Sequence, residues 1–535
     1  MIGRRSNWWL RIWSGGLLAS LTLVSQTVRA QGENADTFAA LLERGEAERV
    51  IELLAPRVRN LDVSQANTYR EFVGVLLAAY RDSVRCREGV ELLESLAARG
   101  APLGAVEFAA ATEVFSECGR LARFGELLDA AIADAPEDVE LRVERARLRH
   151  SLGRHEAALE DLARARAHGH SNARTLYLEG LCRQELGDVN AAELALRAAL
   201  AADAGHALVE FELGRLLLRD GRARAALPLL KDSFIQQPRS PATLFNLQLA
   251  LDRNGASEEA LRVRAAFAKL SAQAEREKDL VQAVRVNSGE PRTIAELAEF
   301  FLEVGRPSKA LPLAQRVFRS DPQNVHLRVL RARALLASGR VADAELALRA
   351  ALELDSDQPQ LKLWLAELAA RDSRLAEADA WLGACRGQVD EARVLLLDGE
   401  LAARRQRGFE AAAEPIMKAI VGSTSESPAT RLEAILALVD LAVAFHRQPQ
   451  IDAWLTAAAA REPKQPEYEL GRGVLALESS DFAHARARFD ASRRIDPWLS
   501  ATYRFFAQLE ERVGNTDVAR EHRLQASYLR ALAGS

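Results

Sequence analysis

The sequence predicts an all-α protein in which helix–turn–helix units stack into an α-solenoid. The first observation is an internal repeat: four consecutive blocks of equal length begin at Val139, Ala173, Ala207 and Pro241. The second is composition: aromatic residues make up 6% of the 535-residue chain, and Ala, Leu, Arg and Glu dominate. Small and aliphatic side chains favour closely packed helices. A repeat of roughly 20–50 residues is typical of a solenoid, in which each unit contacts its neighbours.

Small residues recur at fixed places in each block. A Gly at place 15 can take the left-handed conformation that ends a helix. An Ala at place 20 and a small residue at place 8, such as Gly180 or Gly214, let the two helices of a unit approach closely. We therefore expect helix A over about places 2–14 and helix B after the turn. The turn and contact residues are Gly153, Gly187, Gly221 and Gly255, with Ala158, Ala192, Ala226 and Ala260.

Residues 1–30 have the pattern of a signal peptide. The segment begins with basic residues, including Arg4, Arg5 and Arg11, and continues with an apolar run from Ile12. Val28-Arg29-Ala30 then resembles the small-residue A-x-A pattern of a cleavage site. The apolar run, about thirteen residues, is too short for a spanning helix. We expect cleavage near Ala30, a periplasmic or secreted protein, and no integral membrane span in the mature chain. The alternative is an uncleaved anchor.

The repeat register extends to both sides of the four blocks, with three interruptions. In the last of them Gly408 and Ala413 suit places 15 and 20, and in the unit from Pro359 the residue Ser373 replaces the turn glycine. We expect about 13–14 units, as one array or two. The expected segments are degenerate helical repeats in 31–104, an N-terminal array in 105–274, a linker or helix extension in 275–290, a central array in 291–392, a degenerate repeat with a polar loop in 393–431, and a C-terminal array in 432–535.

The pattern resembles the tetratricopeptide repeat (TPR) family, whose unit has the same length and carries Gly near place 15 and Ala at places 20 and 27. The likeness covers nearly all of the mature chain. The family's aromatic signature is weak, because place 4 holds Leu176 or Leu244 where the family often has Trp. The resemblance implies a right-handed superhelix whose concave groove is lined by helices A.

The resemblance also implies a binding site, because places 5, 9 and 12–13 of helix A tend to face that groove. Aromatic and Arg side chains dominate binding energy at interfaces. We expect a groove for a protein or peptide partner with apolar and acidic groups. The alternative is that the aromatic rings only fill the seam between neighbouring helices A. The candidate residues are Tyr177, Phe211 and Phe245 at place 5, Arg147 and Arg215 at place 9, and Arg219 and Arg253 at place 13.

Other kinds of site find little support. The chain has no Walker-type phosphate loop, no H-E-x-x-H and no G-x-S-x-G, so we expect no catalytic residues and no cofactor. A formal net charge of −4 argues against a nucleic-acid partner. A zinc site needs three or four converging ligands. Because His168, His170 and His206 fall in predicted loops, where surface histidines are common, we expect no metal site.

The four cysteines lack C-x-x-C spacing. In an exported protein Cys86 and Cys118 could form a disulfide. The better interpretation is that all four cysteines are small buried side chains. Together these observations predict a non-enzymatic protein–protein interaction scaffold in the cell envelope. The alternative is a carbohydrate-binding or enzyme-accessory component of an exopolysaccharide export system.

Overall fold

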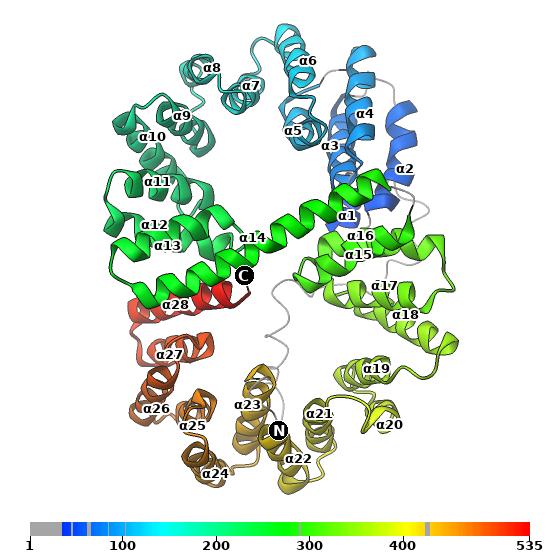
Figure 1. Ribbon diagram of the computed structural model, residues 1–535, viewed down its shortest axis with the longest axis vertical. Coiled ribbons are helices and arrows are strands. Elements are labelled where there is room, and N and C mark those ends of the chain that lie inside the picture. The colour runs from blue at the N-terminus through cyan, green and yellow to red at the C-terminus, as the bar shows by residue number, and fades with distance from the viewer. Residues whose placement is uncertain are drawn as a thin grey trace. The chain divides into compact units, whose positions relative to one another are not determined.

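The computed structural model describes residues 35–43, 47–60, 66–83, 85–101, 103–287, 290–422 and 428–534. The predicted signal peptide, residues 1–30, lies outside the described residues. The chain divides into two compact units, Met1–Arg120 and Leu121–Ser535. Throughout the described ranges the regular secondary structure is α-helical (Figure 1). None of the described helices combines the length and the apolar character needed to cross a membrane.

In the first unit α3 contacts each of the other four helices. The rings of Phe38 and Phe72 meet edge to face with centroids 5.8 Å apart. Tyr80, Phe108 and Phe115 are buried in the same unit. Its helices are α1 (Ala35–Glu43), α2 (Ala47–Asn60), α3 (Ala66–Asp82), α4 (Cys86–Ala98) and α5 (Ala105–Glu117).

The second unit is a run of antiparallel helix pairs in which consecutive helices contact one another. Its helices are α6 (Leu121–Asp134), α7 (Val139–Ser151), α8 (His155–Ala167), α9 (Ala173–Glu185), α10 (Val189–Ala202), α11 (Ala207–Arg219), α12 (Ala223–Gln236), α13 (Pro241–Arg253), α14 (Ser257–Val286), α15 (Pro291–Glu303), α16 (Pro307–Ser320), α17 (Val325–Ala337), α18 (Val341–Leu354), α19 (Pro359–Arg371), α20 (Leu375–Cys385), α21 (Glu391–Arg404), α22 (Phe409–Gly422), α23 (Pro428–Ala444), α24 (Gln448–Arg461), α25 (Pro466–Glu478), α26 (Phe482–Ile495), α27 (Ser500–Val513) and α28 (Thr516–Gly534).

The close contact within each unit is made by the small residues that recur in the sequence. A Cβ added to Gly180 would lie 2.7 Å from Leu196, and one added to Gly214 would lie 2.8 Å from Leu230. Both contacts join place 8 of helix A to place 24 of helix B. The place-20 alanines Ala158, Ala192, Ala226 and Ala260 are buried. The predicted all-α solenoid of helix–turn–helix repeats is confirmed.

The predicted turn glycines end helices A in the left-handed region, with φ of 74° at Gly153 and 83° at Gly187. Ser373 takes the same role at φ 62°. The turn after α21 holds two left-handed residues: Gln406, with φ 55°, follows the C-cap of α21, and Gly408, with φ 95°, directly precedes α22. The reason is the turn length, because the turn spans 405–408 there and only 186–188 between α9 and α10.

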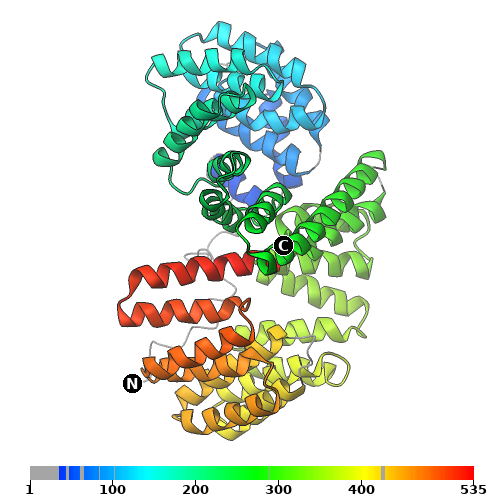
Figure 2. The same cartoon turned by 60° about the vertical axis from the view of Figure 1, so that its left-hand side comes forward.

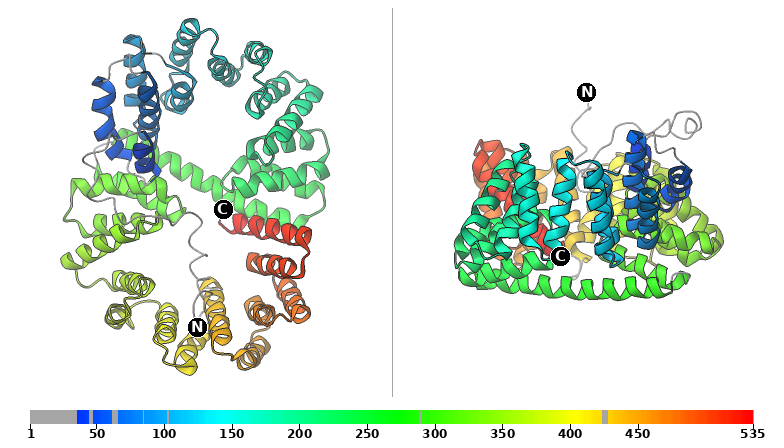
Figure 3. Two further views of the ribbon diagram at one scale, coloured as in Figure 1. Left: turned by 180° about the vertical axis from the view of Figure 1, so that it is seen from behind. Right: turned by 90° about the horizontal axis from the view of Figure 1, so that it is seen from above.

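Helix α14 is 30 residues long because the charged run after Ala274 continues the helix (Figure 3). Glu277 on this extension pairs with Arg306 at 2.5 Å and with Lys309 at 3.3 Å. Arg276 pairs with Glu303 at 2.9 Å. The extension is thereby joined to α15 and α16 of the next pair, so the stack continues through this region.

The C-terminal helix returns to an earlier part of the second unit. Figures 1 and 2 show α28, in red, beside the helices that lead into α14, and α28 contacts both α12 and α14. The buried ring of Tyr528 meets Phe234 edge to face at 6.0 Å, and Lys231 Nζ lies 4.7 Å from its centroid. Trp498 Nε1 donates to Glu258 at 3.2 Å, and Arg262 lies over the Trp498 ring at 4.3 Å. The second unit therefore closes on itself.

Candidate functional site

The predicted groove residues all lie on helices A of four successive pairs: α7, α9, α11 and α13. Because each of these helices begins at the first place of its repeat block, equal places fall on equivalent positions of each helix. The residues divide into aromatic side chains at place 5 and arginines at places 9 and 13. The two groups have different surroundings.

The three place-5 rings differ in exposure. Tyr177 and Phe211 are half-buried and pack against the same apolar cluster. Phe245 is 53% exposed. Two of these rings contact a ring from outside their own helix. The ring centroids of Tyr177 and His206 are 6.2 Å apart, and those of Phe245 and Phe267 of α14 are 6.0 Å apart. Phe245 is therefore the place-5 ring with the most surface open to a partner.

Both place-9 arginines are paired with a glutamate of the same helix, one turn earlier. Arg147 Nε donates to Glu144 at 2.9 Å, and Arg215 Nε donates to Glu212 at 2.9 Å. Glu144 is buried and also accepts from Arg174 of the next pair. A carboxylate of a ligand would therefore have to compete with Glu144 or Glu212 for these arginines.

Tyr177 lies in the electrostatic field of the Glu212–Arg215 pair. Burial raises the pKa of the Tyr177 hydroxyl, and the nearby Glu212 adds to the shift. Burial also raises the pKa of Glu212, although Arg215 opposes that shift. The structure thus brings Tyr177 of one pair together with a charged pair of the next.

The two place-13 arginines differ. Arg219 is exposed. Arg253 Nη1 donates to the backbone carbonyl of Leu218 at 2.6 Å, which satisfies a carbonyl at the end of the preceding helix A. Arg512 Nη1 likewise donates to the backbone carbonyl of Leu477 at 2.7 Å. Arg253 therefore has a structural role that recurs in the array, and Arg219 is the place-13 arginine available for a ligand.

His168, His170 and His206 lie between helices, as expected from the sequence. His170 Nε2 lies 2.7 Å from Glu140, and His206 lies against the ring of Tyr177. His150 and His155 instead come together with Cys182. Cys182 and Cys385 are buried, and burial raises the pKa of the Cys182 thiol to about 11.

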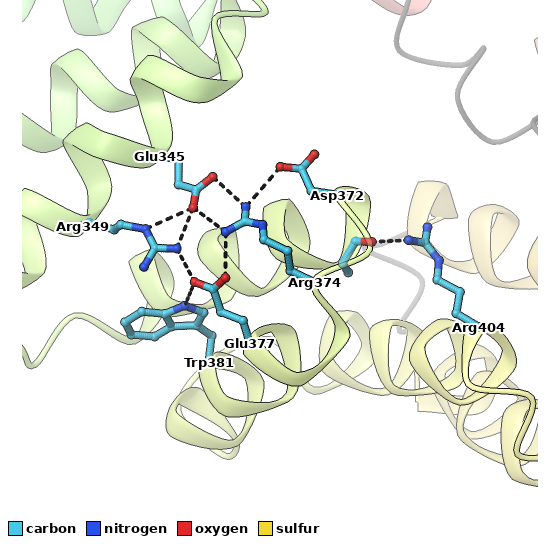
Figure 4. Close-up of polar contacts among 8 residues, drawn as sticks. Glu345, Arg349, Asp372, Arg374, Glu377, Trp381 and Arg404 are labelled. Carbon is cyan, nitrogen blue, oxygen red and sulfur yellow. Dashed lines mark hydrogen bonds and ion pairs between the residues drawn. The ribbon is translucent and has the colours of Figure 1, made fainter.

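A polar network outside the predicted groove residues joins α18 to α20 (Figure 4). Glu345 accepts from Arg374 at 2.7 Å and from Arg349 at 2.6 Å, and the pKa of Glu345 is lowered by these hydrogen bonds. Glu377 accepts from Trp381 at 3.2 Å. The repeat pattern carries a signal for this network. Its glutamate is at place 21, one arginine is at place 25, and the other arginine is at place 16 of the next unit. Glu193, Arg197 and Arg222 occupy the same three places and form the same contacts.

A second charged cluster lies on helices A of the later pairs. Arg393 of α21 pairs with Glu367 of α19 at 2.6 Å and with Glu433 of α23 at 3.1 Å. Burial raises the pKa of the adjacent Glu400 carboxyl to about 7, and Arg404 opposes the shift. These charges are too irregular in spacing to appear as a repeat pattern, because 393–431 breaks the period.

Glu400 should make stability depend on pH. Because its pKa is raised by folding, the protonated form favours the folded state, and stability is lost as pH rises from about 4.5 to about 7. We expect Glu400→Gln to remove this loss, which is on the order of 1–3 kcal/mol at pH 8. Thermal melting at pH 5 and pH 8 measures the effect. Glu414→Gln, at an exposed residue of α22 paired with Lys418, should not reproduce the gain; equal gains for both variants would contradict the assignment.

Comparison with known proteins shows similarity to a family model, to a curated relative and to solved structures. A tetratricopeptide repeat family model matches residues 301–368. The chain is 28% identical over 194 residues to cellulose synthase operon protein C of Pseudomonas fluorescens (strain SBW25), and the match covers 31% of this chain and 15% of that protein. The chain thus spans a small part of the length of this relative.

Two solved structures are similar over most of the chain. Naa15/Naa10 bound to HypK-THB has a TM-score of 0.31 and 13% identity, covering 91% of this chain and 98% of that one. The APC/C hetero-tetramer Cut9–Hcn1 has a TM-score of 0.31 and 15% identity, covering 84% and 97%. The family-model match identifies a tetratricopeptide repeat segment in residues 301–368, and the repeat register, the left-handed turns and the buried place-20 alanines show helix–turn–helix units similar to it in 139–274.

Proposed function

We propose that the chain is a non-enzymatic scaffold that binds a protein or peptide partner on the face formed by α9, α11 and α13. The observation that carries this proposal is Phe245, 53% exposed and in ring contact with Phe267. Phe211 and Tyr177 occupy the equivalent place on the two preceding helices A. Solenoids present extended concave surfaces of this kind to their partners, and exposed aromatic side chains are common anchors there.

The charges support a partner that combines apolar and acidic groups. Arg219 is exposed at place 13 of α11. Arg147 and Arg215 are already paired with Glu144 and Glu212. In this proposal the partner's apolar side chains contact the rings, Arg219 receives an acidic group, and the internally paired arginines contribute less. Most of the binding free energy would then come from the aromatic residues.

We further propose that the scaffold is exported to the cell envelope. The support is the signal-peptide pattern that ends at Ala30. A second candidate function, within a polysaccharide synthesis or export system, is favoured by the partial similarity to a protein named for a cellulose synthase operon. The identity of a captured partner distinguishes the two roles, so one experiment addresses them together.

The experiment is affinity capture from an envelope extract with mass spectrometry of the captured proteins. We expect the double variant Phe211→Ala plus Phe245→Ala to weaken capture of the partner by about tenfold or more, because aromatic anchors dominate interface energies. Phe445→Ala is a matched control, since Phe445 is 37% exposed and lies 6.0 Å from another ring, Phe409. The intact mass of the purified chain reports cleavage at Ala30.

Equal capture by the double variant and the wild type would show that this face does not bind the partner. A partner that belongs to polysaccharide synthesis would favour the second candidate function. An intact mass that retains residues 1–30 would contradict cleavage of the signal peptide.

A further inference from the structure

Three side chains with metal-binding atoms meet where α7 and α8 face α9. His150 lies near the end of α7, His155 is the first residue of α8, and Cys182 lies on α9 of the next pair. One nitrogen of each histidine and the cysteine sulfur all lie within 4.8 Å of one another. The cluster therefore joins two neighbouring repeats, and its members come from three helices.

The separations suit a shared metal ion. Cys182 Sγ lies 3.7 Å from His150 Nδ1. Two ligands of one tetrahedral zinc ion, with a Zn–S bond of about 2.3 Å and a Zn–N bond of about 2.0–2.1 Å, are ~3.6 Å apart. The widest separation in the cluster would have to close by about 1 Å to reach this value. Such a change requires rotation of the imidazole side chains, both of which are half-buried.

The surroundings leave one member without a partner. Cys182 is fully buried in an apolar cluster with Leu178 and Val143. A thiol–imidazole hydrogen bond accounts for Cys182 and His150. His155 Nδ1, however, is buried and has no hydrogen-bond partner among the described residues. Buried polar nitrogens normally have partners, because leaving one unsatisfied costs free energy. A metal ion held by all three residues gives each of them a partner.

We propose that His150, His155 and Cys182 bind one Zn²⁺ ion. Imidazole and thiolate ligands select a borderline-soft ion such as zinc over Mg²⁺ or Ca²⁺, which prefer oxygen. Three protein ligands leave a fourth position for water or for Glu185, which is one turn after Cys182 on α9 and interacts electrostatically with His150. The spacing of the histidines does not predict this site, because the third ligand is a cysteine on the helix A of the following repeat.

The ion would join the α7–α8 turn to the next helix A. A ligand that binds only the folded state stabilises it in proportion to the logarithm of ligand concentration over Kd. Zinc should therefore raise the melting midpoint of the full chain. It would also hold α7 and α9 in a constant relative position.

The test is zinc binding by the purified full-length chain, measured by elemental analysis after dialysis and by titration with Zn²⁺. We expect one equivalent of zinc per chain and a higher melting midpoint. Co²⁺ in place of zinc should give the thiolate-to-cobalt charge-transfer absorption and the intense visible bands of a tetrahedral site. Cys182→Ser and His155→Ala should each weaken zinc binding by more than the roughly 10–100-fold that loss of an outer-shell partner costs.

Matched controls are available in the same chain. Cys385→Ser changes another buried cysteine, and His170→Ala changes a nearby loop histidine. Both should keep one equivalent of zinc and the cobalt spectrum. If Cys182→Ser does not fold, His155→Ala carries the test, because His155 is half-buried at a helix start. Less than stoichiometric binding by the wild type, or wild-type affinity in His155→Ala, would overturn the proposal.

Discussion

Gly399→Ala is expected to lower the melting midpoint of the protein substantially. Gly399 lies on α21, and a Cβ there would be 2.4 Å from Ile416 Cγ1 and 2.7 Å from the backbone oxygen of Ala412. A side chain can rotate away from such a contact, but a backbone oxygen cannot. Helices α21 and α22 would have to separate, and overpacking of this kind costs about 1–3 kcal/mol or more. Thermal and chemical denaturation of the full chain measure the effect.

Gly383→Ala provides a control with the opposite sign. Gly383 lies inside α20, and a Cβ there meets no atom within 4 Å. The same substitution should then stabilise the protein by about 0.5–1 kcal/mol, because Ala favours a helix more than Gly does. A stabilising effect of both substitutions would contradict the close approach of α21 and α22.

Tyr528→Ala is expected to be the most damaging substitution in the C-terminal helix. Tyr528 is 1% exposed, its ring meets Phe234 of α12, and Lys231 lies over its face. Removing a buried aromatic side chain typically costs about 3–5 kcal/mol. The loss should release α28 from α12 and α14, because Tyr528 and Leu529 are the buried residues of α28 in that cluster. Hydrogen exchange of α28 and α12, together with the melting midpoint, would show both consequences.

A double-mutant cycle distinguishes this contact from a general loss of stability. Phe234→Ala and Tyr528→Ala should be coupled by about 0.5–1.5 kcal/mol, the usual range for an aromatic pair. The control pair combines Phe234→Ala with Phe506→Ala, since Phe506 of α27 instead meets Phe489 and His522. That pair should be additive. Additive effects of Phe234→Ala and Tyr528→Ala would mean that the two rings do not meet in solution.

The candidate binding face was predictable in outline from the repeat register. Equal places in successive units put Tyr177, Phe211 and Phe245 on equivalent positions of helices A. Their different exposure was not predictable, because it depends on Phe267 and the other side chains packed around each ring. The pairing of Arg215 with Glu212 was visible as an i,i+3 spacing, but spacing alone does not show which charges are available to a ligand.

The repeat unit, its turn and its small contact residues are determined by the sequence alone. Their interactions join residues of one unit or of adjacent units, so the same chemical requirement recurs in every repeat and leaves a pattern. Only the tertiary structure shows that α28 meets α12, or that His155 joins His150 and Cys182. Tyr528 and Phe234 are brought together by the path of the whole array, and such a contact occurs once. It therefore leaves no periodic trace in the sequence.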